Sequence, residues 1–258
     1  MEPEIIAVLL TAAAAAGWVD AVVGGGGLLL LPALLVAFPH APVANLLGTN
    51  KLAAVFGTAS AAVTYSRGLK LERRVVGPAA GLALLGAGSG AALAGMVSSD
   101  ALRPIIMVVL LVVAAVVLFR PTLGVAADPT LPSTRRMVAA VLVTGVGIGF
   151  YDGLIGPGTG TFLIIALTTI TGLDFVSASA SAKIVNTATN LGALVVFALN
   201  GHILWLLGLG LAVCNIIGAQ IGARMALRRG AGFVRIVLLV VVVGLIAKLG
   251  WEEFGHLV

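Results

Sequence analysis

The sequence predicts an all-α polytopic membrane protein built from two inverted repeats, each with about five helical segments that include a short helix broken by glycines. Hydrophobic residues make up 60% of the chain and charged residues only 10%, whereas a soluble domain carries about 25% charged residues. The apolar runs are continuous, unlike the alternating segments of about ten residues in an outer-membrane barrel. A constant internal spacing then divides the chain into two halves.

The unusual residues of the first half return in the second half after 132 residues, the difference between 152 and 20. The interval relates Asp20 to Asp152, Lys51 to Lys183, Gly24 to Gly156, and Gly26 to Gly158. We therefore assign residues 1–119 to transmembrane repeat 1, residues 120–136 to a cytosolic linker and residues 137–258 to transmembrane repeat 2. The linker contains Pro121, Pro129 and Pro132, a composition typical of a connecting segment.

Apolar runs justify the helices in order. They lie at about 5–23, 28–38, 43–65, 75–97 and 104–119, and then at 137–155, 160–172, 176–199, 203–224 and 234–251. A membrane span needs about 20 residues. The runs 28–38 and 160–172 are too short for an ordinary span and occupy equivalent places. Each is predicted to be a short or broken helix, and the sequence leaves open whether it spans or re-enters.

The basic residues predict the orientation in the membrane. They cluster as Arg67, Lys70, Arg73 and Arg74, then Arg120, Arg135 and Arg136, and finally Arg224, Arg228 and Arg229. Basic loops stay in the cytosol, so both termini are predicted to be extracytoplasmic in a multi-pass protein. Each half then crosses an odd net number of times, which inverts the second half. The net charge of +5 belongs to these loops, so we exclude a nucleic-acid partner.

Glycine clusters precede both short segments. The glycines are Gly24, Gly25, Gly26 and Gly27 in the first half and Gly156, Gly158 and Gly160 in the second. A glycine run at membrane depth ends one helix and leaves the N–H groups of the next helix free to bind an anion. The simpler interpretation is close helix packing. No Gly-Lys-Ser/Thr sequence follows either run, which excludes a nucleotide-binding loop.

Polar residues inside the third apolar run of each half are the candidate substrate ligands. Thr49, Asn50 and Lys51 stand in the first half, and Lys183, Asn186 and Asn190 share one helix face in the second. A lysine deep in an apolar run must reach the interface, pair or face water. We expect both lysines to face the interior, where together they could neutralise an anion.

Asp20 and Asp152 each lie four residues before a glycine cluster. Two interpretations stay open. Each aspartate forms a salt bridge that makes a buried lysine tolerable, or each accepts a proton and couples it to transport. The sequence does not choose between them.

The remaining candidate residues give weaker indications of function. His40, His202 and His256 have no metal-ligand spacing, so we predict no metal and no cofactor. Tyr65 and Tyr151 stand near segment ends and fit an aromatic belt. Cys214 is single, which excludes an intrachain disulfide.

Segments from both halves resemble the TauE/SafE sulfite exporter family. They are residues 150–160 (FYDGLIGPGTG), 180–186 (ASAKIVN), Gly24–Gly27 with Pro32, and 48–52 (GTNKL). The resemblance implies an inner-membrane transporter of small anions such as sulfite, sulfonates and related organosulfur compounds. It maps the family's glycine motifs onto Gly24, Gly26, Gly156 and Gly158, and its polar motifs onto Asn50, Lys51, Lys183 and Asn186. Ile164 stands opposite Pro32, so the two glycine breaks are expected to differ in shape.

The predicted function is a secondary transporter of small anions that works by alternating access within the lipid bilayer. An anion channel is the main alternative, and a non-transporting scaffold is a weaker one. An intramembrane aspartyl protease is a further alternative, but no Gly-x-Gly-Asp sequence is present, so we expect no catalytic residues and no enzyme. Substrate, direction, coupling ion and homodimer formation stay open.

Overall fold

The computed structural model describes residues 3–69, 71–119 and 133–254, and within them it contains helices and no strands. The first half comprises α1 (Pro3–Val23), α2 (Gly27–Ala37), α3 (Val43–Gly68), α4 (Arg73–Met96) and α5 (Ser99–Phe119). The second half comprises α6 (Thr134–Val141), the π-helical segment η1 (Leu142–Gly147), α7 (Ile148–Leu154), α8 (Thr159–Thr171), α9 (Phe175–Leu199) and α10 (Trp205–Phe254). The predicted all-α fold is confirmed.

The helices follow the apolar runs closely. Segments α6, η1 and α7 are continuous and form one span, and α10 joins the last two predicted runs across a kink at Gly230, whose φ is 72°. Five described helices are long and apolar enough to cross a membrane. Helix α6 begins at Thr134, inside the segment predicted to be the linker. Residues 120–132 of that linker lie outside the described part of the chain.

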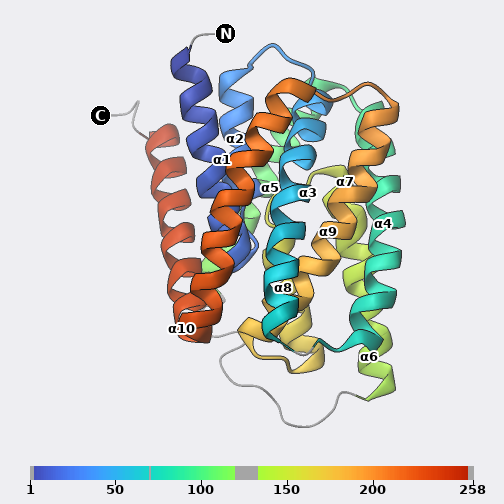
Figure 1. Cartoon of the computed structure of the whole chain (residues 1–258). Coiled ribbons are helices and arrows are strands. Elements are labelled where there is room, and N and C mark those ends of the chain that lie inside the picture. Colours follow the sequence, from blue (N-terminus) through green and yellow to red (C-terminus); the bar gives the residue numbers. More distant parts are fainter. Residues whose placement is uncertain (1–2, 70, 120–132, 255–258) are drawn as a thin grey trace.

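The two halves run in opposite directions through the bundle. Helix α1 starts at the upper end in Figure 1, whereas α6 starts at the lower end. The short helices α2 and α8 follow the glycine clusters and return toward the end from which their half began (Figure 1). This course is compatible with the predicted inverted repeats. It also places the end of α3, the start of α4 and the start of α6 at the same lower end.

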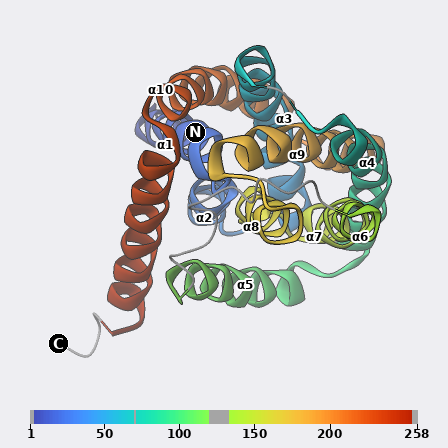
Figure 2. The ribbon, with the colours of Figure 1, turned by 90° about the horizontal axis from the view of Figure 1, so that it is seen from below.

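The halves are interlocked rather than placed side by side. Helix α1 packs against α10, and its counterpart η1–α7 packs against α4. Likewise α3 packs against α10, α9 packs against α4, and the two helices α3 and α9 pack against each other at the centre (Figure 2). Because each main contact joins one half to the other, the core belongs to both repeats.

Glycines make the closest of these contacts. A Cβ at Gly90 of α4 would lie 2.1 Å from Phe150 O, and a Cβ at Gly222 of α10 would lie 2.6 Å from Trp18 O. Gly222 lies 132 positions after Gly90, and Phe150 lies 132 positions after Trp18. The same close approach therefore occurs twice. Small residues allow such backbone contact between membrane helices, where dispersion rather than the hydrophobic effect favours packing.

We therefore predict that Gly90→Ala destabilises the protein and Gly81→Ala does not. Both glycines lie on α4, but a Cβ at Gly81 meets no heavy atom within 4 Å. Overpacking a close contact costs about 1–3 kcal/mol, whereas alanine favours the helix over glycine by about 1 kcal/mol. Thermal unfolding of the detergent-solubilised variants measures both effects, and equal melting temperatures would contradict the assigned contact.

Candidate functional site

Two ion pairs join the repeats inside the bundle. Lys51 Nζ lies 2.7 Å from Asp152 Oδ2, and Lys183 Nζ donates to Asp20 Oδ2 at 2.9 Å. Each pair therefore takes its lysine from one half and its aspartate from the other. The two pairs are related by the same 132-residue interval (152 to 20 and 183 to 51). Of the two interpretations left open for the aspartates, the salt bridges are present.

The local sequence explains where these four side chains stand. The lysines lie within the long central helices α3 and α9, and the aspartates lie in the last turns of α1 and α7, just before the chain leaves helical geometry. Gly24 and Gly156 then adopt φ values of 80° and 92°, a region that L side chains rarely occupy. The glycine break thus turns the chain back while the aspartate before it faces the central helix of the other half.

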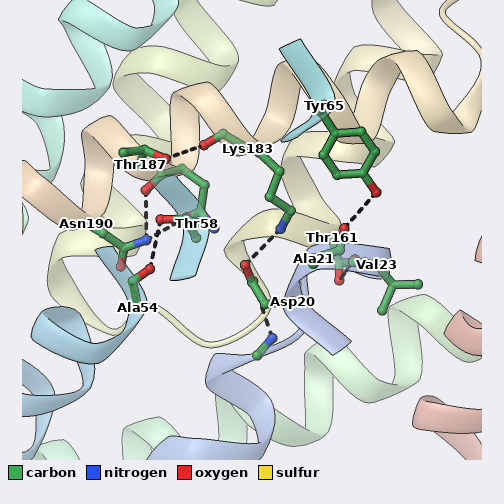
Figure 3. A network of polar contacts seen from close by, with 12 residues as sticks. Asp20, Ala21, Val23, Ala54, Thr58, Tyr65, Thr161, Lys183, Thr187 and Asn190 are labelled. Atoms are coloured by element: carbon green, nitrogen blue, oxygen red, sulfur yellow. Dashed lines mark hydrogen bonds and ion pairs between the residues drawn. The ribbon is translucent and has the colours of Figure 1, made fainter. Parts of the chain in front are cut away.

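The pairs differ in burial. The side chains of Lys51 and Asp152 are each 2% exposed, whereas Lys183 is 0% and Asp20 is 13% exposed. Asp20 also accepts a hydrogen bond from the backbone N–H of Gly26 at 3.4 Å through Oδ1. The carboxylate of Asp20 therefore accepts a backbone hydrogen bond in addition to its lysine partner, which the described part of the chain does not provide for Asp152. The Asp20–Lys183 pair is drawn in Figure 3.

The two glycine breaks touch each other. A Cβ at Gly24 would lie 2.1 Å from Gly160 C, and a Cβ at Gly160 would lie 2.4 Å from Gly24 Cα. Across this contact Thr161 N donates to Gly24 O at 3.2 Å, and Thr161 Oγ1 donates to Val23 O at 2.9 Å (Figure 3). The start of α8 is thereby fixed against the end of α1.

The breaks are not identical in shape. Gly26 has right-handed helical angles, whereas its counterpart Gly158 has a φ of 79° in the left-handed region. This difference agrees with the expectation drawn from Pro32, which lies inside α2. The backbone N–H groups of Gly158 and Gly160 donate no hydrogen bond to any acceptor in the described part of the chain. Free N–H groups at a helix N-terminus favour an anion.

A small cavity lies between the ion pairs and the glycine breaks. Its lining residues are Asp20, Gly24, Gly27, Asn50, Lys51, Ala54, Asp152, Gly156, Gly158, Thr159, Gly160, Asn186 and Asn190. Its volume of about 20 Å³ has room for about one water molecule. The lining comes from α1, α2, α3, α7, α8 and α9, so elements of both halves converge on one site.

The cavity has one amide-rich wall. Asn186 and Asn190 of α9 line it, and Asn190 Nδ2 donates to Asn186 O at 2.7 Å. The equivalent positions on α3 are Ala54 and Thr58, since 186 and 190 minus 132 give 54 and 58. A polar ligand would therefore find hydrogen-bonding amides from α9 and from Asn50, and only a methyl group at Ala54. The internal symmetry of the sequence does not extend to the lining.

Four predicted site residues lie outside the lining: Gly25, Gly26, Thr49 and Lys183. Thr49 Oγ1 donates to Asn45 O and accepts from Leu204 N at 3.0 Å, which directs it to the α9–α10 connection. Lys183 reaches the site only through Asp20. Conversely Ala54 and Thr159 line the cavity without having been predicted to do so. Gly27 and Gly160 also line it; they belong to the predicted glycine clusters but were not singled out as substrate ligands. The repeat spacing could have indicated Ala54, the counterpart of Asn186, and Thr159, the counterpart of Gly27.

The prediction that Tyr65 belongs to an interfacial aromatic belt is wrong. Its side chain is fully buried, and its hydroxyl donates to Ala21 O at 2.9 Å, beside Asp20 (Figure 3). Tyr151 is half-buried and its hydroxyl donates to Pro157 O, inside the second glycine break. Tyr65 therefore fixes the backbone of the residue that follows Asp20, and Tyr151 fixes the second glycine break. Their position near the ends of apolar runs suggested the interface, because the sequence does not show that Ala21 O and Pro157 O are their acceptors.

The chain is similar to a family and to several named proteins. The model of the family described as "Sulfite exporter TauE/SafE" matches residues 9–249. "Probable membrane transporter protein ORF9" of Sinorhizobium sp is 36% identical over 219 residues, 85% of this chain and 82% of that protein. "Probable membrane transporter protein YfcA" of Escherichia coli K12 is 34% identical over 233 residues, 88% of this chain and 82% of that protein. "Probable membrane transporter protein" of Haemophilus influenzae is 31% identical over 228 residues, covering 87% and 88%. No solved structure matches the chain.

The unequal burial predicts unequal costs when a lysine is removed. Lys51→Met leaves Asp152 buried and unpaired, which costs about 3–5 kcal/mol for a buried charge. Lys183→Met should cost less, because Asp20 is 13% exposed and keeps a backbone hydrogen bond. Melting temperatures at neutral pH measure both. The double variant Lys51→Met with Asp152→Leu is expected to recover the stability, and a Lys183→Met variant less stable than Lys51→Met would contradict the assignment.

Proposed function

Because the chain belongs to the TauE/SafE sulfite exporter family, we propose that this membrane transporter carries small anions, with sulfite, sulfonates and related organosulfur anions as the substrate class. The relatives are named as membrane transporters, without a substrate. The proposal includes the cell inner membrane as the location, with both termini extracytoplasmic. It describes a carrier and not an enzyme.

The observation that most strongly supports this proposal is the composition of the cavity. The cavity is lined by the ammonium group of Lys51, by the amides of Asn50, Asn186 and Asn190, and by Gly158 and Gly160. The backbone N–H groups of these two glycines have no acceptor among the described residues. Oxyanions bind through charge-assisted hydrogen bonds from such donors. The N-termini of α2 and α8 add partial positive charge, as in transporters whose broken helices hold a substrate near the bilayer midplane.

The small size of the site supports a mechanism of alternating access. With space for about one water molecule, the cavity must widen before it holds an oxyanion. The main helix contacts join one repeat to the other, so a displacement of one repeat against the other moves opposite walls of the cavity apart. Rocking of repeats around a fixed site is the motion expected of this architecture.

The geometry argues against an intramembrane aspartyl protease. Such an enzyme needs two carboxylates close enough to share a proton. Asp20 and Asp152 are instead each bound to a lysine at 2.9 and 2.7 Å.

A channel is distinguished from a carrier by counterflow, because external substrate accelerates the exit of labelled internal substrate only through a carrier.

We predict that Asn186→Leu reduces sulfite or sulfonate flux in proteoliposomes at least about tenfold, equivalent to about 1.4 kcal/mol, because it removes one of the cavity's amides. Thr187→Val on the same helix is the matched control, since Thr187 Oγ1 donates to Lys183 O and does not line the cavity. Lys51→Met with Asp152→Leu should fold and lose transport. Normal flux through a folded double variant would reject the site, and flux without counterflow would favour a channel.

A further inference from the structure

We propose that a singly charged anion takes the place of Asp152 at Lys51, and that Asp152 then binds one proton, so that anion and proton cross together. This inference rests on the proposed anion transport and adds the coupling ion and its stoichiometry. The proposal assigns different tasks to the two ion pairs. In the first pair, Lys51 exchanges Asp152 for the anion. In the second pair, Lys183 and Asp20 remain bound to each other.

Charge balance within the site is the first step. The charged side chains at the cavity are Asp20, Lys51 and Asp152, and Lys183 balances Asp20 from outside the lining. Two lysines and two aspartates leave the site neutral before an anion enters. An added anion would then be an uncompensated charge inside the membrane, which is strongly unfavourable. Uptake of one proton restores neutrality.

The choice of lysine follows from the cavity. Lys51 lines it, and its Nζ lies 2.9 Å from the position a Cβ would take at Gly156, in the second glycine break. Lys183 does not line the cavity. An anion that enters between the glycine breaks therefore meets the ammonium of Lys51, and it competes there with the carboxylate of Asp152 alone.

The choice of aspartate follows from its contacts. Asp152 is 2% exposed, and its Oδ2 lies 2.7 Å from Lys51 Nζ but accepts no hydrogen bond within the described part of the chain. Once the anion holds Lys51, this carboxylate has lost its charge partner in a buried place, which favours its protonated form. Asp20 differs, because Lys183 and the Gly26 N–H still bind it.

The other groups around Asp152 offer no substitute for Lys51. Tyr151 on the same helix already donates to Pro157 O. Across the cavity, Asp20 from α1 has the same charge, and Lys183 from α9 is bound to it. The sequence of α8 contains no charged residue, and helices α4 and α6 carry their arginines in the first turn: Arg73, Arg74, Arg135 and Arg136.

The transfer balances without a further reactant. A proton from the aqueous phase forms an O–H bond on the Asp152 carboxylate, while the anion forms an ion pair with Lys51. On release the O–H bond breaks, the proton leaves with the anion, and Asp152 returns to Lys51. One monoanion and one proton move per cycle, so that transport is electroneutral.

Methanesulfonate is the probe, because this strong acid stays singly charged over the usable pH range and any proton uptake then belongs to the protein. Proteoliposomes containing the wild-type protein receive an outward methanesulfonate gradient, a potassium–valinomycin clamp and an internal pH dye. We expect one proton per anion, a flux independent of the imposed potential, and an apparent affinity for methanesulfonate that falls about tenfold per pH unit over the range in which one proton is taken up per anion. Flux with no proton movement, or flux that follows the potential, would overturn the coupling and leave anion transport intact. Folded protein that moves neither sulfite nor any sulfonate would reject the proposed function itself.

Variants locate the proton. Asp152→Asn is neutral like the protonated acid, so it should transport methanesulfonate without protons and with a current. The double variant Asp20→Asn with Lys183→Met removes the other ion pair as a neutral unit. The site stays neutral before the anion enters, so this variant should keep a ratio of one proton per anion at whatever rate it retains, and a ratio near zero there would overturn the assignment to Asp152. If Asp152→Asn does not fold, the wild-type protein in weakly buffered detergent provides the same test. Methanesulfonate binding should take up one proton per bound anion, and binding without proton uptake would contradict the proposal.

Discussion

The structure depends on keeping four charges inside a membrane bundle. An isolated charge at membrane depth is expensive, and neither half of this chain neutralises its own in the observed arrangement. Lys51 is balanced by Asp152, and Lys183 by Asp20, so each half supplies the counter-ion of the other. This exchange explains why the main helix contacts also cross between the halves. A repeat that moved away alone would strand a lysine and an aspartate, which makes the ion pairs the natural place where motion and ligand binding are linked.

Glycine fixes the depth at which this happens. Each aspartate stands in the last helical turn before Gly24 or Gly156, whose left-handed backbone ends the helix. The second break then meets the first directly, because Gly24 and Gly160 leave no space for a Cβ between their backbones. Irregular backbone at membrane depth is tolerated only inside protein or beside a wet cavity. Here it lies inside, and Gly158 and Gly160 of the second break line the same small space as Lys51 and the α9 asparagines.

The sequence predicted the helices well, because long apolar runs between basic loops leave little choice of element. It also selected Lys51, Asp152, Asn186 and Asn190 as polar residues within those runs. It could not predict which lysine pairs with which aspartate, since the 132-residue interval is equally consistent with pairs inside one half and with pairs between halves. Thr49 was expected beside Lys51 in the site, but on a helix it faces a different side and bonds to Asn45 and Leu204. Tyr65 was assigned to the interface from its position in the run, whereas its acceptor is the backbone of Ala21, which only tertiary packing brings near.

The differences between the halves matter as much as their likeness. Duplication by itself would give two equivalent ion pairs and a symmetrical cavity, with no reason for either pair to open first. In this chain Asn186 lines the cavity where its counterpart is Ala54, and Asp20 keeps a backbone hydrogen bond that has no equivalent at Asp152 in the described part of the chain. Lys51 therefore stands beside the amides that can donate hydrogen bonds to an anion, and it pairs with the carboxylate that has no backbone hydrogen bond in the described part of the chain. Both differences lower the cost of exchanging Asp152 for an anion and raise the cost of exchanging Asp20, so a nearly symmetrical scaffold acquires one pair that holds the repeats together and one pair that can part.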